Sequence, residues 1–397
     1  MRVLVVSNET PSERATGLRR RLYHTLNALA QIARVDLFSV VDPEWATPAP
    51  AAEDLRLPRT RVIQLPRSRR RRRILRTIPG ELAAARDEAV RQAFLTWAAP
   101  PYDLVWFSRV NGYVMLADLL SAPHVVDLDD LEHRKLMAQR RARATGPERP
   151  GLAETLRWLM LERRVARTAD AVVLCSTLDR DRLGMGNIWV VPNGYEDTVP
   201  MGRATGPAAA GRPPTITLVG LLRYGPNADG ARLLVREILP RIHQVIPDAR
   251  VRLVGQAGLD VTSLHLPPAV TVTGWVSDVA SELERADVIV APLRYGSGTR
   301  TKIIEAFAHR IPVVSTALGA EGLDAIHGRH LLIGETAAEL ADACVALLRD
   351  QALRARLVRE AHRLYRDRFR WVDIAEKVKQ VALTTAAVSR EGFPTRS

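Results

Sequence analysis

One stretch in the C-terminal half, residues 286–308, most restricts what this chain can fold into. It begins with the apolar run Val288–Ala291, whose lack of polar alternation predicts a strand covered on both faces. Gly296 and Gly298 follow and predict a tight turn, after which three apolar residues recur at helical spacing. A strand, a glycine turn and a helix in this order are typical of parallel α/β folds.

The same turn predicts an anion site. Ser297 or Thr299 is expected to cap the helix, whose free N–H groups and dipole favour a phosphate. Arg300 and Lys302 place two cations in the first turn, where a dipole disfavours them unless an anion lies between them. Lysine occurs only four times in the chain, so a lysine at this position adds weight to a phosphate role.

Glu305 lies three residues after Lys302, so the two side chains are neighbours on the predicted helix. A carboxylate at this position can accept hydrogen bonds from a vicinal diol such as a ribose. The alternative interpretation is an ordinary i,i+3 ion pair on a solvated helix face. The residues of this stretch leave both interpretations open.

Composition describes an ordinary protein of 397 residues, with 47% hydrophobic and 25% charged residues and a net charge of +13. That charge favours an anionic partner. Cys175 and Cys344 lie in apolar runs and predict buried thiols with no metal spacing and no disulfide framework. The apolar run at the start is too short for a signal peptide, and no run is long enough to cross a bilayer. We therefore expect a cytoplasmic protein.

The densest charge cluster lies at residues 67–73. Such a run is most often a solvated surface, and the sharper hypothesis is a patch that docks on the anionic inner face of a membrane. No aromatic residues interleave to stack bases, so nucleic acid is not an expected partner. The basic residues of the run are Arg67, Arg69, Arg70, Arg71, Arg72 and Arg73.

Strand and helix patterns alternate twice along the chain, which predicts two Rossmann-like parallel-sheet domains facing across a cleft. The first is expected over residues 1–197 and the second over 215–370. Residues 198–214 have the Gly, Pro and Ala content of a linker. Asn227 is expected to cap a helix of the second domain, and a last helix over 371–390 is expected to pack back on the first.

Acidic residues end a predicted strand of the first domain, where open α/β sheets keep their chemistry. Asp127 and Asp129 are the main candidates. A metal site is conceivable, but the cluster has a single nearby histidine, and N-capping explains at least one aspartate. We expect no metal.

Several short motifs in order carry a family resemblance: Val-Pro-Asn-Gly194, Leu-Val-Gly220, Thr-Gly-Trp-Val276, Gly298-Thr-Arg-Thr-Lys302, Ile-Glu-Ala306 and Gly319-Ala-Glu-Gly322. Together they resemble the GT-B-fold glycosyltransferases of family 4 from Met1 to about residue 380. The resemblance implies an enzyme that moves a hexose from a nucleotide-diphosphate sugar, such as a UDP-sugar or GDP-sugar, to an acceptor. It also implies retention of configuration, no cofactor and no metal, with a glycan, lipid-linked or small-molecule acceptor.

Site residues follow from the same resemblance. Arg300 and Lys302 match the diphosphate clamp and are the catalytic candidates together with Asp129, which ends the first-domain strand. Glu305 matches the ribose-binding acid. The other donor-binding candidates are Gly17, Arg223, Tyr224, Trp275, Val276, Ser297, Gly298 and Thr299.

Two departures from the family pattern bear on function. Ser297 stands where the family has an acid that contacts the donor sugar, and Leu221 stands where an arginine is usual, so Arg223 is expected to take part of its load. The serine in place of this acid favours one alternative, a GT-B-like module that binds nucleotide or glycan without turnover.

Overall fold

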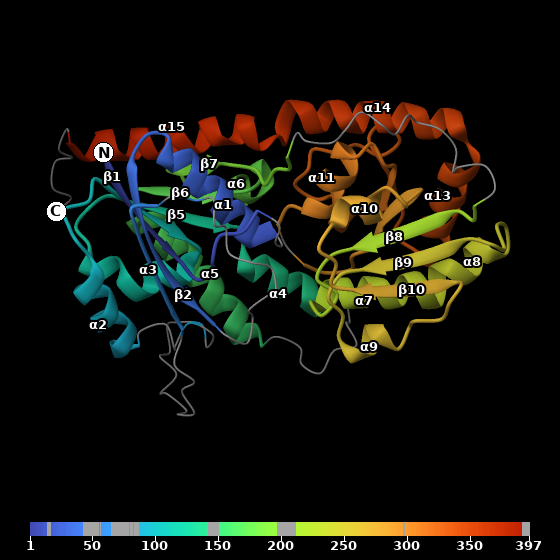
Figure 1. The fold of residues 1–397 in the computed structure, drawn as a ribbon, viewed down its shortest axis with the longest axis horizontal. Helices are drawn as coiled ribbons and strands as arrows, with labels where there is room; N and C mark the ends of the chain where they lie inside the picture. The colour runs from blue at the N-terminus through green and yellow to red at the C-terminus, as the bar shows by residue number, and fades with distance from the viewer. Residues whose placement is uncertain are drawn as a thin grey trace. The chain divides into compact units, whose positions relative to one another are not determined.

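The computed structural model describes residues 1–13, 17–42, 55, 57–64, 79, 82, 87–141, 151–196, 212–296 and 298–390. These residues form two compact units (Figure 1). The first unit comprises Met1–His133, Pro150–Asn193 and Val372–Ser397, and the second comprises Arg134–Arg149 and Gly194–Trp371. The arginine run at 67–73, most of the expected linker and Ser297 lie outside the described residues.

In the first unit the described residues form a seven-stranded parallel sheet of order β3-β2-β1-β4-β5-β6-β7. The strand β1, which lies inside the sheet between β2 and β4, is buried along Val3–Val6 because helices cover both faces. The strands are β1 (Arg2–Ser7), β2 (Arg34–Val41), β3 (Arg59–Gln64), β4 (Leu104–Ser108), β5 (His124–Asp129), β6 (Ala171–Leu174) and β7 (Ile188–Val190). The helices along this part of the chain are α1 (Gly17–Ala30), α2 (Glu88–Trp97), α3 (Val110–Leu116), η3 (Ala117–Leu119), α4 (Glu132–Arg141), α5 (Leu152–Thr168) and α6 (Thr177–Leu183). From Arg134 onward α4 belongs to the second unit.

In the second unit the described residues form a six-stranded parallel sheet of order β10-β9-β8-β11-β12-β13. Its strands are β8 (Thr215–Val219), β9 (Arg250–Val254), β10 (Val270–Gly274), β11 (Val288–Ala291), β12 (Val313–Ser315) and β13 (Leu332–Ile333). Its helices are α7 (Gly225–Leu233), the π-helix η4 (Leu234–Ile238), α8 (Leu239–His243), α9 (Leu259–Thr262), α10 (Val279–Leu283), α11 (Thr301–Ala308), α12 (Ala317–Ala320), α13 (Ala337–Arg349) and α14 (Gln351–Arg368). The last helix, α15 (Trp371–Arg390), belongs to the first unit from residue 372 onward.

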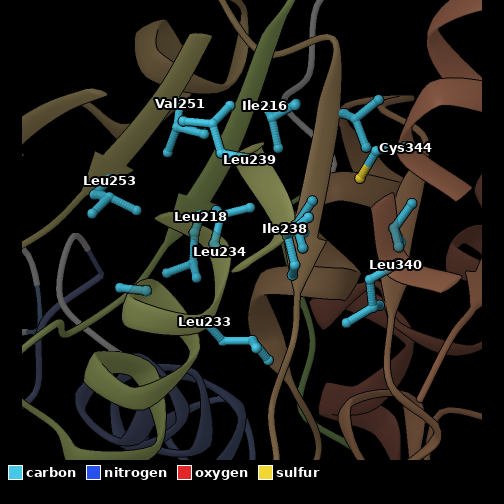
Figure 2. Packing of buried hydrophobic residues seen from close by; sticks show 14 of the residues in the cluster. Ile216, Leu218, Leu233, Leu234, Ile238, Leu239, Val251, Leu253, Leu340 and Cys344 are labelled. Atoms are coloured by element: carbon cyan, nitrogen blue, oxygen red, sulfur yellow. The ribbon is translucent and has the colours of Figure 1, made fainter. Parts of the chain in front are cut away.

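Alternate residues of β11 face two separate cores. Val288 and Val290 pack with η4 and α13, as Figure 2 shows for Ile238, Leu340 and neighbouring residues of that core. Ile289 on the other face packs with α11 and α14. An apolar run without polar alternation is therefore a strand buried on both sides, and the predicted α/β class with two parallel-sheet units is confirmed.

Both predicted caps are wrong. Arg300 occupies the N-cap position of α11, with no side-chain hydrogen bond, so Thr299 lies before the cap. Tyr224 occupies that position for α7, because Pro226 favours the first turn of a helix and starts it earlier. Asn227 thus lies inside α7 with its side chain available for another role. The prediction of buried thiols at Cys175 and Cys344 is confirmed.

Candidate functional site

The carboxyl ends of β8 and β9 approach each other at one edge of the second sheet. Gly220 and Gly255 follow these strands and have φ of 145° and 131°, a region that L side chains rarely adopt. A Cβ on Gly255 would lie 2.0 Å from the carbonyl oxygen of Gly220. Only glycine permits this close approach of the two strands. Because neither glycine has a side chain, the backbone at this edge of the sheet is not covered by side chains of these two residues.

Lys302, in the first turn of α11, reaches this surface. Its Nζ donates a 2.6 Å hydrogen bond to Oδ1 of Asn227. The Nδ2 of Asn227 in turn donates to the carbonyl oxygen of Leu221 over 2.9 Å, which fixes the amide with its oxygen toward the lysine. A methyl group on Gly220 would lie 3.3 Å from the lysine Nζ. The ammonium group therefore stands directly at the end of β8.

The surroundings of Lys302 disfavour its charge. Its side chain is buried, and burial is the main cause that lowers its pKa to about 7. The positive charge of Arg300 lowers the pKa further, while the carboxylate of Glu305 opposes the shift. A bound anion would compensate the two cations, so a phosphate beside Lys302 would be stabilised by both of them.

The turn before α11 contains a buried hydroxyl group without a hydrogen-bond partner among the described residues. The hydroxyl of Thr299 is buried, in a residue 8% exposed, and finds no hydrogen-bond partner in the part of the chain that the structure describes. Among the same residues, Oε1 of Gln256 is likewise buried without one. The guanidinium of Arg300 folds beside Gly296, where a Cβ would lie 2.9 Å from its terminal nitrogen. Unmet buried hydroxyls are uncommon in native proteins, and a ligand oxygen would satisfy this one.

The segment between β11 and α11 is held against α7 by two contacts. Nε and a terminal nitrogen of Arg294 donate to the two carboxylate oxygens of buried Asp229 over 2.8 and 2.5 Å. Gly230 of α7 packs against Pro292, since a Cβ there would lie 3.4 Å from the proline ring. The sequence indicated neither contact, because each joins residues more than 60 positions apart in the chain.

Glu305 lies one turn further along α11 and is 8% exposed. The interpretation of Lys302 and Glu305 as an ion pair on a solvated face is therefore wrong, because both side chains are buried. Trp275 follows the carboxyl end of β10 and is 47% exposed, while Val276 packs on the core beside α11.

The backbone N–H of Arg223 bonds the carbonyl of Gln256, just past the end of β9, over 3.0 Å. Arg223 is half-buried, as is Tyr224 at the start of α7. The structure thus gathers the described candidates Arg223, Gly298, Thr299, Arg300 and Lys302 along the carboxyl edge of one sheet. The sequence did not reveal the role of Asn227, because an asparagine near the start of a helix is also typical of an N-cap.

The first unit has its own polar cluster at the carboxyl end of β5. Arg21 of α1, which is buried, bonds both carboxylate oxygens of Asp127 at 2.9 Å. Asp129, the last residue of β5, has φ of 63° and accepts a 2.8 Å hydrogen bond from Nδ2 of Asn193. Gly17 begins α1, the helix that carries Arg21.

Burial raises the pKa of Asp129 against the opposing charge of Arg21. The asparagine of the Pro-Asn-Gly motif therefore orients a carboxylate, a role that its turn propensity did not reveal. Within the described residues no group of three His, Cys, Asp or Glu side chains is arranged to hold a metal ion. None of the described helices combines the length and apolar character needed to cross a bilayer.

Residues 213–350 match the family described as "Glycosyl transferases group 1". A phosphatidyl-myo-inositol mannosyltransferase of Mycobacterium leprae is 30% identical over 207 residues, which are 49% of this chain and 53% of the relative. The Mycobacterium tuberculosis proteins of that name are 30% identical over 187 residues. The chain thus spans about half the length of the curated relatives it matches.

Similar solved structures cover nearly the whole chain. A sucrose-phosphate synthase from Thermosynechococcus elongatus is 20% identical and has a TM-score of 0.72, over 98% of this chain and 99% of that one. HepE of Anabaena, in complex with UDP and glucose, is 17% identical with a TM-score of 0.65, over 95% and 98% of the two chains. At these identities the likeness establishes the fold of both units.

Proposed function

We propose that this chain, which has the GT-B fold and whose residues 213–350 match the group 1 glycosyltransferases, transfers a hexose from a nucleotide-diphosphate sugar to an acceptor hydroxyl. The family match lies over the second unit, which also carries the predicted phosphate site. In the proposal the second unit binds the donor and the first unit provides the acceptor side.

The observation that carries the proposal is the arrangement of cationic and hydrogen-bonding groups around Lys302. Its ammonium stands beside the glycine backbone at the end of β8, and the hydroxyl of Thr299 is buried without a partner among the described residues. Breaking a sugar–phosphate bond builds negative charge on the departing diphosphate. Lys302, Arg300 and the N–H groups that open α11 would stabilise that charge more than the intact donor, which is what lowers the barrier.

The remaining donor contacts follow the family resemblance. Glu305, one turn deeper on α11, would accept hydrogen bonds from the ribose hydroxyls. Trp275 and Val276, after β10, would line the base. Arg223 would supply a further cation in place of the arginine that Leu221 replaces.

The sugar and the course of the reaction are further parts of the proposal. Mannosyl transfer appears in the name of the Mycobacterium relatives, and UDP with glucose is bound in HepE, so a hexose is the best-supported donor sugar. We propose retention of configuration, with the departing phosphate assisting the acceptor proton and no metal required. Asp129 would then act on the acceptor side, held by Asn193.

Donor turnover without acceptor tests the proposal. The protein is incubated with UDP-glucose, GDP-mannose and UDP-N-acetylglucosamine, and release of the nucleoside diphosphate is measured alongside calorimetric binding of each donor. We expect one donor to bind and to be slowly hydrolysed. Binding without release, even with a panel of acceptors, would support the non-catalytic alternative, and no binding of any donor would contradict the proposed site.

A further inference from the structure

A second surface, remote in sequence from the donor site, lies on α5 of the first unit (Figure 1). Leu152, Leu156 and Met160 recur every fourth residue, so they lie on one face of this helix. They are 60%, 47% and 55% exposed, respectively. Three large apolar side chains in a row on an exposed helix face indicate a binding surface, because single exposed residues are common but contiguous ones are not.

The exposed face becomes basic toward the C-terminal end of α5. Arg163, Arg164 and Arg167 are exposed there. The acidic residues of the helix lie elsewhere: Glu154 pairs with Arg157 over 2.8 Å, and Glu162 is buried against His133. The face is therefore apolar at one end and uniformly positive at the other.

A groove runs beside this face, between α3 and α5. It has a volume of about 550 Å³. Its walls are mainly apolar, and Met160 of the exposed row lines it, so groove and face are continuous. Arg164 and His124, the first residue of β5, also line the groove. The rest of the lining is apolar at Val114, Ala117, Leu161 and Val165 and polar at Tyr113, Asp118 and Thr168. The carboxylate of Asp118 is paired with Arg91 over 2.9 Å.

The groove is also separate from the candidate site in the first unit. His124 begins β5, whereas Asp129 ends it, so the two residues belong to opposite edges of the sheet. At about 3.3 Å per residue, the five steps between them span roughly 16 Å.

We propose that the α5 face binds the surface of an anionic lipid bilayer, with the groove taking up one apolar chain. In a bilayer the acyl chains lie beneath the negative headgroups. The apolar row of the α5 face would contact the acyl chains, and the arginines would contact the headgroups. The charge complementarity favours anionic lipid over an acidic protein, because an acidic protein would leave the apolar row and groove without a matching partner. The inference is independent of the donor site, and it would bring the acceptor side of the protein to a membrane.

Vesicle sedimentation tests the inference with the full chain. Wild-type protein is mixed with vesicles of phosphatidylcholine alone or with one quarter phosphatidylglycerol, and the bound fraction is measured at low and high salt. We expect binding only to the anionic vesicles, and weaker binding at high salt. Arg163→Gln and Arg167→Gln, made as separate single variants, should each weaken binding to the anionic vesicles about fivefold.

The double variant Leu156→Glu, Met160→Glu should weaken binding by roughly tenfold or more, because two apolar side chains no longer enter the lipid. The matched control is Leu383→Glu, a leucine 50% exposed on α15, which should bind as wild type does. Circular dichroism confirms that the variants fold. Unchanged sedimentation of the double variant would overturn the inference.

Light scattering without lipid supplies a second readout. A monomer at all concentrations supports the lipid assignment. A dimer that the Leu156→Glu, Met160→Glu variant abolishes would assign the face to a second copy of the chain and overturn the inference. Binding of the nucleotide sugar by the same variants is measured by calorimetry, and we expect it to be unchanged. The result for the membrane surface can then be judged separately from the proposed function.

Discussion

The Nζ of Lys302 in α11 donates a 2.6 Å hydrogen bond to the Oδ1 of Asn227 in α7, and the two residues are 75 positions apart in the chain. The Asn227 amide is a neutral partner, so this bond does not neutralise the ammonium group. An acidic partner at position 227 would have neutralised the lysine and closed the site to an anion. The pairing thus holds the cation in place while leaving its charge for a ligand.

Replacing Lys302 by Met should weaken binding of the nucleotide sugar. The side chain keeps its length but loses a charge-assisted hydrogen bond to phosphate, so we expect Kd to rise by about 10- to 100-fold. Calorimetry measures the change. Lys377→Met, at an exposed position of α15, is the matched control and should bind as wild type does. Equal affinity in both variants would remove Lys302 from the donor site.

Donor affinity should depend on pH through Lys302. Burial lowers the pKa of this lysine to about 7 in the free protein, and a bound diphosphate would raise it, so binding takes up a proton. The complex then loses affinity as pH rises through 7, and Kd should increase by about fivefold from pH 7 to pH 8, because the charged fraction of the free lysine falls from about one half to about one tenth. The diphosphate of a nucleotide sugar carries no proton to lose in this range, so it adds no slope of its own.

Calorimetry in two buffers of different ionisation enthalpy gives the number of protons taken up. Lys302→Arg serves as the control, because a guanidinium stays charged across the range and its profile should be flat. A wild-type profile as flat as that of the arginine variant would contradict the assignment.

The sequence predicted the parts of the fold that depend on local pattern. Val288–Ala291 was recognisable because a strand buried on both faces needs a continuous apolar run. β3, with the sequence Arg-Thr-Arg-Val-Ile-Gln, was missed because an edge strand has one side open to water and tolerates charge. Lys302 and Glu305 were found because a single helix carries both.

Contacts between distant segments were beyond prediction. The pairing of Asn227 with Lys302 and that of Asp229 with Arg294 depend on how α7 packs beside the turn before α11. No local spacing encodes such packing, and an asparagine near a helix start fits a cap as well as a ligand contact. Asn193 was likewise recognisable as a turn residue but not as the partner of Asp129.

Replacing Arg294 by Leu should destabilise the second unit and weaken donor binding together. The change removes the 2.5 Å ion pair of Arg294 and leaves the buried carboxylate of Asp229 facing the guanidinium of Arg232 at 3.7 Å. We expect a loss on the order of 2 kcal/mol, less than for an enclosed pair because Arg294 is 41% exposed. Thermal unfolding and calorimetry measure the two effects.

The control is Arg285→Leu. Arg285 is 62% exposed and lies 3.6 Å from Glu282, so its removal should change the melting temperature little. An Arg294→Leu variant with lower stability but wild-type donor affinity would show that the ion pair does not position the turn.

Replacing Asn193 by Ala should slow sugar transfer while leaving donor affinity unchanged. The substitution removes the 2.8 Å hydrogen bond to Asp129, whose pKa burial already raises. Without the Asn193 amide the Asp129 carboxylate loses its orientation, and its pKa rises further because the hydrogen bond to its charged form is gone. A hydrogen bond to a charged group contributes about 1.5–3 kcal/mol, so we expect transfer to fall by about 10- to 100-fold. The acid limb of the rate–pH profile should also move toward higher pH.

Calorimetric donor binding separates this effect from damage to the second unit, because Asn193 and Asp129 both belong to the first. Asn187→Ala is the matched control, since the Nδ2 of Asn187 also donates a 2.9 Å hydrogen bond in the first unit, but to the carbonyl of Ala169. It should cost stability without changing the pH profile. An Asn193→Ala enzyme with the wild-type rate and profile would exclude Asp129 from the reaction.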